Sequence, residues 1–212
     1  MKYPKAYSGI KKVFASEILN IISTVIVFLT SVFSVYVRDD VTFENDPAGF
    51  FALLGLTGGS VLFALIAFIL QLVGFNQARK EERLFKKCIY FVIICAVCTV
   101  AMMFTGGMFN KICAGIDEVS TLLVNVYLIM GIYTLAENLE NPSMQKRGKV
   151  VLLIVTILFG SALALQIVMA FMPEFAENLN VVNAIIEFVG YIICLVYVGM
   201  GVRMLSKLKH GR

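Results

Sequence analysis

Six apolar stretches of about 20 residues follow one another along this chain, and they constrain its fold more than any other feature. A helix of this length spans the hydrocarbon core of a bilayer, which is about 30 Å thick. Lipid tails cannot satisfy backbone N–H and C=O groups, so such segments must be helical. We therefore predict an all-α polytopic bundle of six transmembrane helices, over residues 13–37, 50–75, 88–107, 119–136, 150–172 and 181–202.

The composition argues against a water-soluble fold. Hydrophobic residues make up 59% of the chain and charged residues 15%, whereas an ordinary soluble domain has about 25% charged residues. The first apolar run is too long for a signal-peptide core of about 7–15 residues, so we expect it to be retained. The short termini and loops leave no room for a soluble domain. We predict one integral-membrane domain over residues 1–212.

Basic residues are distributed unevenly between the loops, which predicts the orientation. Positively charged flanks remain on the cytoplasmic side during insertion. Only Arg38 and Lys111 fall on one predicted face, which also carries acidic loops. The other face takes sixteen of the 18 basic residues: Lys2, Lys5, Lys11, Lys12, Arg79, Lys80, Arg83, Lys86, Lys87, Lys146, Arg147, Lys149, Arg203, Lys207, Lys209 and Arg212. Both termini are therefore predicted to be cytoplasmic. The composition of the chain favours a multi-pass protein of a bacterial plasma membrane.

Small and polar residues predict how the helices pack. Gly55 and Gly59 form a small-xxx-small pair, and Gly160 lies in a similar pattern on the fifth span; such pairs let two backbones approach closely. The contact could lie within the chain, in a homo-oligomer or with a partner membrane subunit. The first span has a polar face, including Ser16 and Ser23, that we expect to turn away from lipid. Similar glycine-containing ends of alternate spans also allow three related hairpins.

A layer of polar side chains is predicted in the outer half of the bundle. Counted from the outer ends of their spans, several polar residues lie at a depth of about 10 Å. They are Thr57, Asn125, Gln166, Asn183 and Glu187. The Glu187 carboxylate is costly in hydrocarbon and needs a proton, a cation, amide donors or water to offset its charge. The alternative to a binding role is that the Glu187 side chain reaches the lipid headgroups or is neutral and hydrogen-bonded.

A second polar level is predicted near the inner ends of the first two spans. Glu17, Asn20 and Gln71 lie there at similar depth. With the outer layer they would form two polar sites separated by the middle of the bundle, as in a two-gate path.

Several chemical functions lack the residues that they need. The only histidine is His210 in the C-terminal tail, which argues against zinc and nucleophile–base chemistry. Cys95 and Cys98 form a CxxC inside a span and are interpreted as packing residues, and Cys113 is expected to face outside. Phosphate-binding motifs are absent. We expect no enzyme, cofactor, metal or nucleic-acid partner.

Two hypotheses for function follow. The first is a small transport protein that binds or moves a cationic or protonatable solute, its identity unknown, through the polar site. The second is a non-transporting interaction or assembly subunit that packs against partner membrane proteins through its small-residue faces.

Overall fold

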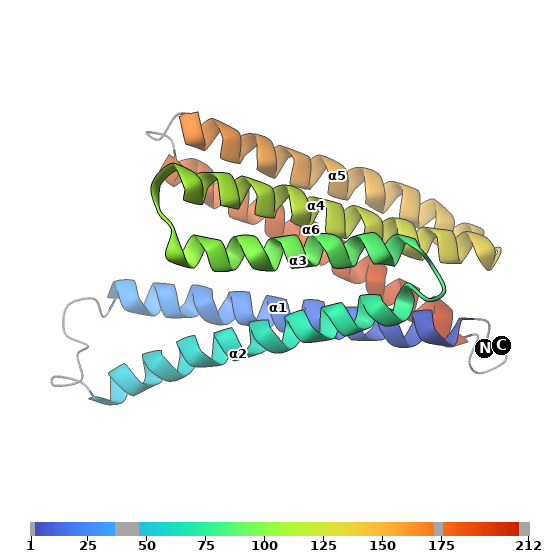
Figure 1. Cartoon of the computed structure of the whole chain (residues 1–212), viewed down its shortest axis with the longest axis horizontal. Helices are drawn as coiled ribbons and strands as arrows, with labels where there is room; N and C mark the ends of the chain where they lie inside the picture. Colours follow the sequence, from blue (N-terminus) through green and yellow to red (C-terminus); the bar gives the residue numbers. More distant parts are fainter. Residues whose placement is uncertain (1–2, 37–46, 172–175, 208–212) are drawn as a thin grey trace. The chain divides into compact units, whose positions relative to one another are not determined.

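The computed structural model describes residues 3–36, 47–171 and 176–207, and they form six helices (Figure 1). These helices are α1 (Pro4–Tyr36), α2 (Pro47–Ala78), α3 (Leu84–Phe104), α4 (Gly107–Asn138), α5 (Pro142–Phe171) and α6 (Ala176–Lys207). Within the described residues there is no strand, so the predicted all-helical fold is confirmed.

Five of the described helices, α2 to α6, are long and apolar enough to cross a membrane. The first predicted span, residues 13–37, overlaps α1, which begins nine residues earlier, at Pro4, and ends next to residues outside the described part of the chain. The protein is therefore a multi-pass membrane protein in contact with a lipid bilayer.

Two helices, α1 and α5, begin well before their predicted spans, and side chains outside the apolar runs cap their first turns. α5 begins at Pro142, where a proline needs no hydrogen-bond partner. The Asn141 side chain accepts a hydrogen bond from the Met144 backbone N–H at 3.1 Å, as an N-cap residue does. At the start of α1 the Glu81 carboxylate accepts the backbone N–H groups of Lys5 at 3.1 Å and Ala6 at 2.5 Å.

The largest difference from the predicted spans is at α4. Prediction began this span at residue 119 and assigned Cys113, Asp117 and Glu118 to an outer loop, which is wrong. The helix begins at Gly107, whose φ of +62° is a left-handed conformation that glycine adopts readily. Asp117 and Glu118 are therefore helical residues about three turns into α4.

The chain divides into two compact units. The larger unit comprises Met1–Lys11 and Gly74–Arg212, and the smaller comprises Lys12–Val73. The single domain expected from the sequence remains a prediction.

In the larger unit α4 is the central helix. It packs against α3, α5 and α6, and α5 also packs against α6. Its buried side chains include Leu128, Ile129, Ile132 and Leu135. The chain passes back and forth, so α4 and α6 run in the same direction and α3 and α5 run against them (Figure 1). The first turns of α1 and the last turns of α6 lie at the end that also carries residues 79–83, which we call the basic end.

In the smaller unit Ser16 and Ser23, on the polar face of α1, are buried, whereas residues of its apolar face are exposed. The buried Ser23 hydroxyl donates a hydrogen bond to the Ser60 carbonyl of α2 at 2.9 Å. Exposed residues on α1 include Ile18, Ile22 and Val25. This arrangement is the one expected for a helix that faces lipid on one side.

Candidate functional site

Two carboxyl groups meet between α4 and α6. The side chains of Glu118 and Glu187 lie within hydrogen-bonding reach of each other, and both are half-buried. Each is about three turns from the first residue of its helix, and the two helices are parallel, so the pair lies at one depth. Two carboxylates this close repel each other unless a proton or a cation lies between them.

Two amide side chains complete the cluster. Gln166 of α5 donates from Nε2 to Oε1 of Glu118 at 2.7 Å, and Asn183 donates from Nδ2 to Oε1 of Glu187 one turn further along α6. We call these four residues, Glu118, Gln166, Asn183 and Glu187, the acid–amide cluster. The grouping of Glu187, Asn183 and Gln166 agrees with the outer layer predicted from the sequence.

The acid–amide cluster has more acceptors than donors. Asn183 is 7% exposed, and its Oδ1 is buried without a hydrogen-bond partner among the described residues. The only basic residue of α4 is the exposed Lys111, about 10 Å from Glu118 along the helix. Buried acceptors without donors are costly. The cluster is therefore suited to a proton, a cation or an ammonium group.

Asn125 does not join this cluster, although the sequence placed it at the same depth. Its Nδ2 donates to the Thr121 carbonyl at 3.1 Å, and its Oδ1 accepts from Cys194 Sγ at 3.2 Å. Asn125 is seven residues beyond Glu118, so this contact lies about 10 Å further along the helices. Residues predicted from the sequence to lie at the same depth in the membrane therefore do not all belong to one site.

The α4–α6 interface repeats every two turns. Glu118 pairs with Glu187, Asn125 pairs with Cys194, and the third contact of this register is between Ile132 and Gly201. The offset between partners is 69 residues in each case. A Cβ at Gly201 would lie 2.9 Å from Ile132 Cγ2, so the last contact is tight. Beyond the acid–amide cluster, this interface is closed by packed side chains.

The inner polar level predicted from the sequence is partly formed within the smaller unit. Gln71 donates from Nε2 to Oε1 of Glu17 at 3.0 Å, so these two residues are brought together. The backbone carbonyls of Asn20 and Thr57 accept hydrogen bonds from Thr24 and Ser60. These bonds lie within their own helices, and they assign neither side chain to a site.

The cysteines lie at packed positions. Cys95 Sγ donates to the Asp117 carbonyl at 3.7 Å and lies 3.6 Å from the Thr121 hydroxyl. The expectation that Cys113 faces outside is wrong, because its side chain is buried in α4, 6% exposed, beside Cys98. Among the described residues no group of three or more histidine, cysteine or acidic side chains is placed to hold a metal ion.

The glycines predicted to mediate packing have open space around them. A Cβ built on Gly55, Gly59 or Gly160 meets no atom within 4 Å among the described residues. Close approach is instead found at glycines that the sequence did not single out for packing. They are Gly9, Gly131, Gly148, Gly190 and Gly201.

Glu118 is the site residue that sequence reasoning missed. The polar residues before it lower the local hydropathy, and the predicted span therefore began one residue too late to include it. Its seven-residue spacing from Asn125 was the available signal, because that spacing puts both on one helical face.

Known proteins do not add to this description: no family model, curated protein or solved structure matches the chain.

Proposed function

We propose that this protein binds a small cationic or protonatable solute at the acid–amide cluster and moves it across the membrane without chemical conversion. The observation that supports this proposal is the pair formed by Glu118 and Glu187, beside an Asn183 Oδ1 that has no hydrogen-bond partner in the described part of the chain. An ionisable residue inside a membrane segment is a functional candidate by default. Two that converge from different helices, with acceptors left over, suggest a ligand that brings positive charge.

The charge distribution gives this proposal a direction. Except for Lys111, the described basic residues of the larger unit gather at its basic end, and we place that end in the cytoplasm of a bacterial cell. The acid–amide cluster then lies toward the outer surface, where acidic residues would raise the local concentration of cations.

Movement past the cluster requires the α4–α6 interface to change. The Asn125–Cys194 and Ile132–Gly201 contacts close it toward the basic end. Transport would separate these contacts while the solute is bound, as alternating access requires.

The test is cation-dependent stability and flux of the full chain. We expect the melting temperature of the purified protein to rise with one cation or small amine, because a ligand at 100 times its Kd stabilises by about 2.7 kcal/mol. Glu187→Gln and Glu118→Gln should each abolish that rise and lower uptake into proteoliposomes at least tenfold. Glu137→Gln, an exposed acid on the same helix α4, is the matched control and should leave both unchanged.

The proposal fails on either of two results. One is a wild-type protein whose melting temperature no cation, amine or pH change affects. The other is uptake that survives both glutamine substitutions at the wild-type rate.

A second candidate is the assembly subunit, and the open glycines of α2 favour it. A helix face built of Gly55, Gly58 and Gly59 has room for the backbone of another helix. If that face binds a second copy or a partner subunit, Gly59→Leu should convert the purified complex to a smaller species in light scattering, whereas Gly115→Leu should not. Unchanged mass for Gly59→Leu would remove this candidate.

A further inference from the structure

Four basic side chains line a cavity at the basic end of the larger unit. Arg79, Lys80, Arg83 and Lys86 surround a volume of about 430 Å³ where α2 ends and α3 begins. Arg79, Lys80, Arg83 and Lys86 are all exposed. Four cations converging on one cavity favour an anionic ligand with several oxygens.

The acids of the same loop are already engaged by backbone donors. The Glu81 carboxylate accepts from the N–H groups at the start of α1, and Glu82 accepts from the Leu84 N–H at 3.1 Å. These contacts direct both carboxylates to helix N-termini, where negative charge is stabilising. The four cations therefore remain suited to an external anion.

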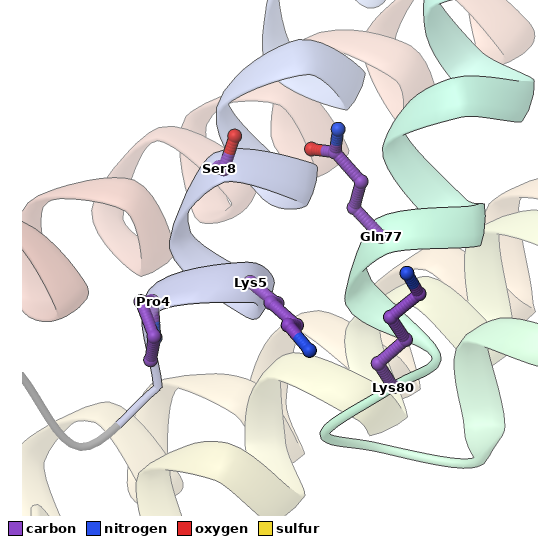
Figure 2. Close-up of a pocket in the computed structure, with 5 residues that line it drawn as sticks. All are labelled: Pro4, Lys5, Ser8, Gln77 and Lys80. Atoms are coloured by element: carbon purple, nitrogen blue, oxygen red, sulfur yellow. The ribbon is translucent and has the colours of Figure 1, made fainter.

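A second cavity adjoins the first and contains acceptors as well as cations. It has a volume of about 390 Å³ and is lined by Pro4, Lys5, Ser8, Gln77 and Lys80, so Lys80 borders both. Figure 2 shows the Lys5 and Lys80 side chains extending into the space between the first turns of α1 and the end of α2. Gln77 Oε1 is buried there without a partner among the described residues. A ligand that carries hydroxyl groups beside its negative charge would supply the missing donor.

An apolar stripe leads away from the cations along α3. Lys86 Nζ lies 5.8 Å from the centre of the Tyr90 ring. Beyond Tyr90, exposed Ile93, Val97 and Val100 continue the same stripe at intervals of three or four residues. From Lys86 to Val97 the helix rises about 16 Å, which is about the thickness of one leaflet's hydrocarbon.

We propose that this basic end binds an anionic glycerophospholipid with a hydroxyl-bearing headgroup, of the phosphatidylglycerol type. The phosphate lies among Arg79, Arg83 and Lys86, and the headgroup hydroxyls reach toward Gln77. The acyl chains follow the Tyr90–Val100 stripe of α3. Basic pockets at the ends of membrane helices bind such headgroups by this combination of charge and depth. The stripe distinguishes a lipid from a soluble phosphate, which has no use for an apolar surface.

The test compares two lipids on the full chain in nanodiscs. We expect phosphatidylglycerol added to a phosphatidylcholine background to raise the melting temperature and to appear as bound lipid in native mass spectrometry. The Arg79→Gln/Arg83→Gln/Lys86→Gln triple variant should weaken phosphatidylglycerol binding at least tenfold. The matched control is Lys146→Gln/Arg147→Gln/Lys149→Gln, which removes the same charge from exposed residues of α5 and should retain binding.

Glycerol 3-phosphate separates a lipid site from a site for soluble phosphates. It should not displace bound phosphatidylglycerol at millimolar concentration. Displacement, or equal weakening by the two triple variants, would overturn the proposal. If the first triple variant does not fold, spin-labelled lipids on the wild-type protein decide: equal immobilisation of phosphatidylglycerol and phosphatidylcholine contradicts it.

Discussion

Among the glycines in the described part of the chain, Gly9 is the one whose replacement by alanine should most destabilise the larger unit, because a Cβ there would meet main-chain atoms. A Cβ at Gly9 would overlap with the Gly74 carbonyl oxygen and lie 2.7 Å from Ala78 N and 2.9 Å from Ala78 Cβ. These are main-chain atoms and a methyl group, none of which can rotate away. The start of α1 must then move off the end of α2.

The expected size follows from two opposed effects. Overpacking against a rigid neighbour costs about 3 kcal/mol, at the upper end of its usual range. Alanine recovers about 1 kcal/mol over glycine inside a helix. The net loss of about 2 kcal/mol should lower the melting temperature of the purified protein by about 4–8 °C for a chain of this size.

Gly115→Ala is the matched control for this experiment. Gly115 lies within α4, and a Cβ there meets nothing within 4 Å among the described residues. Only the helix-propensity gain remains, so this variant should be as stable as wild type or slightly more stable. Equal melting temperatures for the two variants would mean that the start of α1 does not pack on α2 as described.

The helical fold could be predicted from the sequence because backbone N–H and C=O groups in hydrocarbon must form hydrogen bonds within the protein. An apolar run of sufficient length must be a helix, and that single constraint identified all six helices. The ends were less predictable, because they depend on caps. Asn141 before Pro142 is a local capping pattern that can be recognised in the sequence. The cap that Glu81 provides for α1 is a contact between residues distant in the sequence, and no local pattern predicts it.

The candidate site was predictable only in part, for a geometric reason. Asn183 and Glu187 are one helical turn apart, so their hydrogen bond could be expected from spacing alone. Depth along a helix can be counted from the sequence, but the direction in which a side chain points across the bundle depends on the register between helices. With an offset of 69 residues between α4 and α6, Glu118 lies opposite Glu187. Asn125 lies opposite Cys194 instead, two turns further along the helices.

The register between α4 and α6 also explains why Glu118, the residue missed in the sequence, changes the chemistry expected at Glu187. With Glu187 alone, two nearby amides would have been enough to keep a protonated acid satisfied, as the alternative to a binding role requires. With Glu118 opposite it, one proton or one cation must serve two carboxyl groups. A ligand's positive charge would therefore supply a partner that the two carboxyl groups otherwise lack.

Glu118→Lys is expected to make the protein independent of its cation. The introduced ammonium group would lie beside Glu187 and occupy the place that we assign to the ligand's positive charge. The variant should melt at or above the temperature of ligand-free wild-type protein. It should show none of the cation-dependent rise, and its uptake should fall at least tenfold, because a tethered charge cannot leave.

A double variant identifies the cause of this behaviour. In Glu118→Lys/Glu187→Gln the ammonium group has no acid opposite it, so its burial is uncompensated and the melting temperature should fall below that of either single variant. The four proteins form a double-mutant cycle whose coupling measures the pair directly. If the Glu118→Lys variant responds to cations as wild type does, the ligand binds elsewhere, and the carboxyl pair is a structural contact between α4 and α6.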